Sequence, residues 1–185
     1  AEAKFLKAYY HFLLFTYYGP SPIVDINLPI SASDNAVRVK RETVDRCVEY
    51  IVQTIDDALI HLPSRVLSSN DLGRIDRVIA KSIKSRVLVY AASPLFNGNS
   101  EMYSGFVNEN GEHYFNQSYE SYKWELARDA SLDAINAALE NGVGLYEFTS
   151  TPPNYEDEYD EEPFVQKLYD LKYSIVDKWL SLIHI

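Results

Sequence analysis

The chain has 185 residues, of which 46% are hydrophobic and 24% are charged, and its formal net charge is -10. This composition is typical of a folded globular domain and excludes wholesale disorder and a fibrous protein. The acidic balance repels phosphate backbones, so nucleic-acid binding is not expected.

The first predicted helix covers residues 1–18. Its apolar residues occur on more than one face: Phe5, Leu6, Tyr9, Phe12, Leu13 and Phe15. This pattern is typical of a helix enclosed by neighbours, so we interpret it as an internal core element rather than a natural N-terminus. Gly19 and Pro20 then end the helix, and residues 19–40 are predicted to form an irregular connector.

Three further helices are predicted over residues 44–62, 76–92 and 121–141. The helix at residues 44–62 has apolar residues at spacings of three and four and ends before Pro63. The helix at residues 76–92 carries small residues that permit close helix approach. The helix at residues 121–141 aligns Trp124 and Ile135 with alanines and a serine. An acidic run at residues 156–162 precedes a weaker fifth helix at residues 165–179.

The order of these helices predicts an all-α fold built from two helix pairs, the first with the second and the third with the fourth. Stacked helix pairs are typical of a solenoid of the tetratricopeptide kind. The connecting loops are longer than that repeat allows, so the sequence predicts tetratricopeptide-like pairs with long irregular loops.

Residues suited to catalysis or metal binding do not cluster. The four histidines, at positions 11, 61, 113 and 184, lack a second ligand at zinc spacing, and phosphate-loop and nucleophile-elbow motifs are absent. The acids of residues 156–162 match neither a glycosidase pair nor a calcium loop, so an enzyme acting on glycans through them is the weakest hypothesis. We therefore predict a protein that is not an enzyme and has no cofactor and no metal.

The predicted functional region is residues 94–119, a long stretch without helical period that is rich in aromatic residues and asparagines. Long loops tend to be functional or disordered. Aromatic faces and amide groups suit sugar rings, which have apolar faces and hydroxyl edges. The candidate ligand-binding residues are Tyr103, Asn110, Tyr114, Phe115 and Tyr119. The alternative is that these aromatic residues simply hold the loop on the helices.

Three stretches resemble a known family. They are AEAKFLKAYYHF at residues 1–12, YGPSPIV at residues 18–24, and KSRVLVYAASPLFNG at residues 84–98. In combination and order they are similar to the SusD/RagB family of nutrient-binding outer-membrane lipoproteins, and the similarity runs to about Tyr155.

The resemblance implies a surface-exposed lipoprotein of Bacteroidetes-type bacteria that binds an oligosaccharide of the starch type. It also implies that the protein passes this nutrient to a TonB-dependent, SusC-like transporter in the outer membrane. The family fold is a helical scaffold of tetratricopeptide-like pairs whose irregular loops form the ligand face. Membrane attachment would depend on a lipid anchor that lies outside these residues.

The resemblance also predicts how the chain is organised. We expect residues 1–179 to be part of a larger SusD/RagB-like helical domain, without the lipid-bearing cysteine and the C-terminal half. We expect residues 180–185 to be a non-native tail that resembles translated adapter sequence. A second hypothesis, based on the paired helices alone, is a helical-repeat scaffold that binds only protein.

Overall fold

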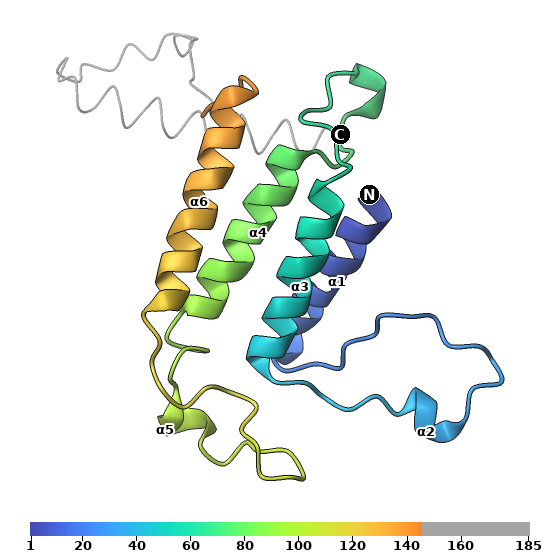
Figure 1. Cartoon of the computed structure of the whole chain (residues 1–185), viewed down its shortest axis with the longest axis vertical. Coiled ribbons are helices and arrows are strands. Elements are labelled where there is room, and N and C mark those ends of the chain that lie inside the picture. Colours follow the sequence, from blue (N-terminus) through green and yellow to red (C-terminus); the bar gives the residue numbers. More distant parts are fainter. Residues whose placement is uncertain (146–185) are drawn as a thin grey trace, which may run out of the picture. The chain divides into compact units, whose positions relative to one another are not determined.

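The computed structural model describes residues 1–145, and the chain divides into two compact units, Ala1–Gly142 and Val143–Ile185. The description that follows is therefore of the first unit. Four long helices form it, together with two short helices and one 3₁₀ turn (Figure 1). The long helices are α1 (Glu2–Tyr18), α3 (Val44–Leu59), α4 (Arg77–Ala92) and α6 (Tyr122–Glu140). The short elements are α2 (Asp34–Val37), η1 (Ser69–Asp71) and α5 (Ser100–Tyr103).

Local signals set the helix ends. The side chain of Thr43 accepts a hydrogen bond from the Arg46 amide at the start of α3, and Asp76 accepts one from the Ile79 amide at the start of α4. These contacts satisfy amides that a helix start leaves unpaired. Helix α1 ends at Gly19, whose φ of 66° suits glycine, and whose amide bonds the Phe15 carbonyl.

Helices α1 and α3 pack against each other and enclose the centre of the core. Large apolar side chains fill their interface, and the buried ones include Phe5, Phe12, Phe15, Ile51 and Ile55. Helix α4 closes this core through Val87 and through Tyr90, whose ring meets Phe12 and Phe15 edge to face. Burial of side chains of this size is the main stabilising contribution to such a unit.

Helices α4 and α6 make the other extensive contact, and small residues dominate it. The buried positions of this pair include Ala80, Ala91, Ala127, Ala134 and Ala137. The hydroxyl oxygens of Ser85 and Ser131 lie 2.7 Å apart across the interface. Helix α4 also contacts α3, so the long helices are joined in the order α1, α3, α4, α6 (Figure 1).

The predicted all-α fold and both helix pairs are confirmed for the described residues, which contain isolated bridges but no strand. Helix α3 ends at Leu59, earlier than the predicted end at residue 62. Pro63 restricts the backbone of Leu62, so the chain turns through His61, whose amide bonds the Ala58 carbonyl.

The expectation that the first helix is enclosed holds for one face only. Phe5, Ala8, Phe12 and Phe15 are buried, whereas Tyr10 is 60% and Tyr17 is 75% exposed. The described residues thus cover one side of α1. None of the described helices is long and apolar enough to cross a membrane.

Several sequence predictions fall beyond the described part of the chain. They are the acidic run at residues 156–162, the fifth helix at residues 165–179 and the tail at residues 180–185. The expected domain of residues 1–179 also extends past it.

Candidate functional site

The loop between α4 and α6, residues 93–121, is closed at its base by Asn97. The Asn97 side chain is 4% exposed; its amide nitrogen donates to the Glu120 carbonyl at 3.0 Å, and its oxygen accepts from the Glu120 amide at 2.9 Å. Gly98 permits this closure because a Cβ at its position would lie 2.6 Å from the Tyr119 nitrogen. Its φ of 82° also favours glycine. The loop is therefore a closed structure built on the ends of two helices.

A continuous set of aromatic rings joins this loop to the core. Phe96 contacts Phe15 with ring centres 4.8 Å apart, and it stacks with Phe115 at 5.8 Å. Tyr103 stacks on Phe115 at 3.8 Å, and Phe106 lies 5.0 Å from Tyr114. Aromatic contacts of this kind add to the stabilisation from burial. These rings hold the loop on the helices.

The structure brings three of the five predicted ligand-binding residues together. Tyr103, Tyr114 and Phe115 belong to the ring cluster, and Phe115 is only 3% exposed. Phe115 therefore supports the loop from within and does not offer its ring to solvent. Tyr119 is 65% exposed, and Asn110 lies at the exposed tip of the turn that Asn108 organises.

Most asparagines of the loop are used by the loop itself. The Asn99 side chain accepts from the Met102 amide, Asn108 accepts from the amides of Asn110 and Glu112, and Asn116 accepts from the Ser118 amide. Within the described residues, the Asn110 side chain has no hydrogen bond. Asn110 and Tyr119 are thus the predicted residues with the most surface available for a ligand.

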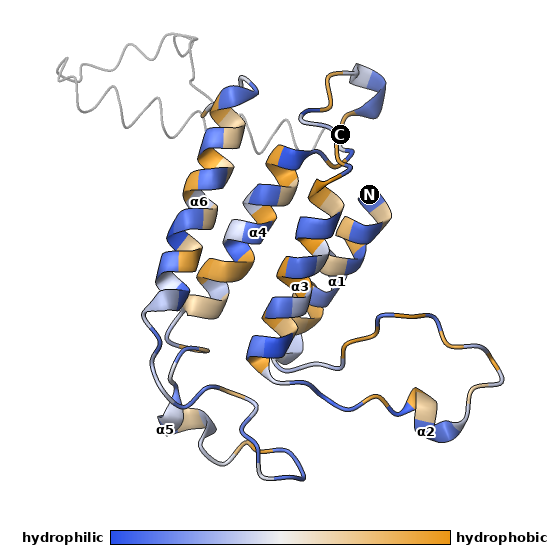
Figure 2. Ribbon diagram, viewed as in Figure 1, coloured by the Kyte–Doolittle hydropathy of each residue, from blue (hydrophilic) through white to orange (hydrophobic). Residues whose placement is uncertain are grey.

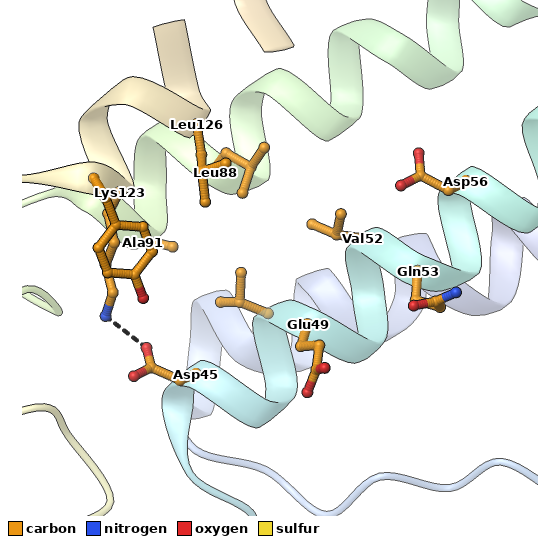
Figure 3. A pocket seen from close by; sticks show the side chains of 11 residues that line it. Asp45, Glu49, Val52, Gln53, Asp56, Leu88, Ala91, Lys123 and Leu126 are labelled. Atoms are coloured by element: carbon orange, nitrogen blue, oxygen red, sulfur yellow. Dashed lines mark hydrogen bonds and ion pairs between the residues drawn. The ribbon is translucent and has the colours of Figure 1, made fainter. Parts of the chain in front are cut away.

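A groove over α4, between α3 and α6, is a second candidate that the sequence did not reveal. It has a volume of about 290 Å³. Its apolar surface comes from three helices that are far apart in sequence (Figure 3): Val48, Val52, Leu88, Ala91 and Leu126. No local signal in the sequence shows that these side chains border a groove.

Acidic side chains of α3 line the open side of this groove, and two lysines face them. Lys123 lies 2.6 Å from Asp45 (Figure 3), and Lys84 lies 2.6 Å from Asp56. Burial alone would lower the pKa of Lys123, but the hydrogen bonds and charges of Asp45 and Glu120 outweigh burial and raise it. Burial, followed by the charge of Glu120, raises the pKa of Tyr122 beside it. Lys123 is therefore a charged structural link between α6 and α3.

Across residues 1–145, no cluster of three or more histidine, cysteine or acidic side chains is placed to hold a metal ion. The loop offers exposed aromatic and amide groups, and the groove offers an apolar floor with a polar edge. Both arrangements suit binding. The fold and these surfaces define a scaffold of helix pairs with two candidate binding surfaces.

The comparisons with known proteins agree with this class. A SusD-like family model, described as starch-binding associating with outer membrane, matches residues 1–89. The solved structure of BT4246 is 38% identical, with a TM-score of 0.69, over 76% of this chain. Its selenomethionine form is 37% identical, with a TM-score of 0.64, over the same share. No curated protein sequence matches the chain.

A further structure, a SusD-like protein (BF3747) from Bacteroides fragilis NCTC 9343, is 26% identical over 49% of this chain and 17% of its own, with a TM-score of 0.44. The chain covers 24% of BT4246 and 23% of the selenomethionine form, so it spans about a quarter of their length. These matches support the resemblance to the SusD/RagB family that the three sequence stretches predict.

Proposed function

We propose that this chain is part of a protein that binds an oligosaccharide of the starch type at the cell surface. The proposal includes delivery of that nutrient to a TonB-dependent, SusC-like transporter in the outer membrane. The observation that carries it is the match of residues 1–89 to a family described as starch-binding associating with outer membrane. In this proposal the protein is a binding protein and catalyses no reaction.

The loop of residues 93–121 is the proposed ligand-contacting region of this chain. Tyr119 would supply an aromatic face and Asn110 a donor and an acceptor for sugar hydroxyls. Tyr103 and Tyr114 are half-buried and would contribute their edges, whereas Phe115 would act by holding Tyr103 in place. The rigid base formed by Asn97 supports the proposal, because a fixed loop loses less entropy when it binds a ligand.

A titration of the 185-residue chain with starch oligosaccharides, followed by NMR of the labelled protein, tests the proposal. We expect the amide signals of Asn110 and Tyr119 to shift as sugar is added. Tyr119→Ala should weaken binding by about tenfold or more, as expected for the loss of a stacking platform. Tyr17→Ala is the matched control, since that tyrosine is exposed but lies on α1.

No shift with any oligosaccharide, together with failure to co-purify with a transporter, would contradict the proposal. The second candidate, a helical-repeat scaffold that binds only protein, is favoured by the groove over α4. Sugar-induced quenching of Trp124, which is 42% exposed at the start of α6, would argue against that candidate.

A further inference from the structure

His11 is a buried titratable group that neither the loop nor the groove uses. It lies on α1 and is 8% exposed. Its Nδ1 is 2.8 Å from the Lys7 carbonyl, and its Nε2 accepts from the Val24 amide at 3.3 Å. The ring also meets the Tyr50 ring of α3 at 4.9 Å between centres. Both ring nitrogens are thus occupied by backbone groups.

The two backbone partners determine which nitrogen carries the proton. A carbonyl can only accept, so Nδ1 must be protonated to bond Lys7. An amide can only donate, so Nε2 must be unprotonated to bond Val24. A second proton would place two donors face to face at Nε2 and remove the bond to Val24. The contact with Val24 therefore exists only while His11 is neutral.

Val24 lies near the start of the connector, residues 19–43, where other contacts also hold the chain. Asp25 accepts hydrogen bonds from Lys7 at 2.7 Å and from Tyr50 at 2.8 Å. At the base of the connector, the Glu42 amide donates to the Ser21 carbonyl, and the buried Cys47 thiol contacts the same oxygen. These contacts connect α1, α3 and the two ends of the connector.

The connector carries several apolar residues, as the hydropathy colouring shows (Figure 2). Val24 is 50%, Ile26 is 68% and Ile30 is 108% exposed. Exposed apolar side chains that gather on one segment are unusual on a folded surface and mark segments that meet other molecules.

We propose that His11 is a proton-operated latch on the connector. Neutral His11 holds the Val24 amide, and protonated His11 releases that amide, while the contacts of Asp25 with Lys7 and Tyr50 remain. The proposal goes beyond glycan binding and does not depend on it.

The other charged groups that face His11 do not change state near neutral pH. Hydrogen bonds from Lys7 and Tyr50 hold the pKa of Asp25 below its ordinary value, so its carboxylate stays ionised. The hydrogen bond with Asp25 raises the pKa of Lys7, and burial raises that of Tyr50. Lys7, Asp25 and Tyr50 therefore keep the same charge state at about pH 5 and about pH 7.5, so they do not produce a pH dependence between these two values.

Amide hydrogen exchange of the labelled 185-residue chain tests the latch. Rates are measured at about pH 7.5 and pH 5 and divided by the intrinsic exchange rate at each pH. We expect the protection of the Val24 amide to fall about tenfold at the lower pH, as expected for the loss of one hydrogen bond. Protection of the Ile55 amide, in the middle of α3, should not change.

His11→Gln is the variant that separates the latch from other effects of acid. The glutamine oxygen can accept from Val24 at both pH values, so protection of that amide should no longer depend on pH. His113→Gln is the matched control at an exposed histidine and should keep the wild-type response. An equal fall in wild type and His11→Gln, or no fall in wild type, would overturn the proposal.

A second measurement on the wild type keeps the test valid if the variant does not fold. The imidazole nitrogens of His11 should show the Nδ1-protonated form at neutral pH. The Val24 amide shift should then change with the same midpoint as that imidazole. Different midpoints would overturn the proposal, as would an imidazole protonated on Nε2 at neutral pH.

Discussion

The two helix pairs of this unit are held together in different ways. Helices α1 and α3 bury large side chains such as Phe15 and Ile55, both of which are 0% exposed. Helices α4 and α6 bury alanines and place Ser85 against Ser131. The large residues of α6 point outward instead, and Ile135 is 54% and Leu139 is 66% exposed.

The difference shows what each pair contributes. The first pair stabilises the unit through the volume of its buried side chains. The second pair gains contact through close backbone approach, which leaves its larger residues on the surface. The free energy of unfolding should therefore depend mainly on the large residues of α1 and α3. The geometry of the loop and the groove should depend on the small residues of α4 and α6.

Of the substitutions that test this comparison, Phe15→Ala should have the largest effect on the free energy of unfolding. The substitution removes a fully buried ring that contacts Tyr90 and Phe96, so we expect the free energy of unfolding to fall by about 3–5 kcal/mol. Urea unfolding followed by circular dichroism measures this. Tyr17→Ala on the same helix is the control, and it should change stability by less than about 0.5 kcal/mol. If both variants lost a similar amount of stability, the buried and exposed faces of α1 would contribute equally to the free energy of unfolding.

Ala127→Leu should have an intermediate effect, because Ala127 is 1% exposed at the contact of α6 with α4. A larger side chain would force the two helices apart and lower the free energy of unfolding by about 1–3 kcal/mol. Asn136→Leu, at an exposed position of the same helix, should be near neutral. A neutral Ala127→Leu in urea unfolding would show that the second pair is loosely packed.

Lys123→Met should have the smallest effect on the free energy of unfolding. It removes the ion pair of Lys123 on α6 with Asp45 on α3, which links the two helix pairs. The folded-state pKa of Lys123 is raised, so its stabilising contribution is fully present below the unfolded lysine pKa and is lost as pH rises through the folded value. Because the Asp45 side chain is 52% exposed, we expect a loss of about 1 kcal/mol at pH 8.

The stability difference between wild type and Lys123→Met should shrink above about pH 10.4. Urea unfolding of both proteins at about pH 8 and above about pH 10.4 measures this difference. Lys4→Met removes an exposed ion pair with Asp57 and is the matched control. An equally large and equally pH-dependent loss in the control would show that Lys123 is an ordinary surface charge.

Much of the helical scaffold could be predicted from sequence. Apolar residues at spacings of three and four, together with Gly19 and Pro63, predicted the long helices to within a few residues. The small residues of the helix predicted at residues 76–92 indicated that another helix could approach it closely. The bounds of the groove could not be predicted, because it joins side chains from α3, α4 and α6 that no local pattern relates.

The candidate site was predicted less well than the scaffold. Aromatic and asparagine content identified the loop, but composition does not show which groups the fold uses internally. Asn97 closes the loop across 23 positions of sequence, and Phe115 belongs to the core. These roles depend on partners that only the folded chain brings near.

The sequence by itself determined the helices, their pairing and the family resemblance, because helical periodicity and short motifs are local properties of the chain. The tertiary structure alone decided which polar groups are left for binding and which hold the fold. It placed His11 against Val24 and Tyr50, and it left Asn110 and Tyr119 at the surface. Such pairings depend on side-chain packing between distant segments, and periodicity carries no information about them.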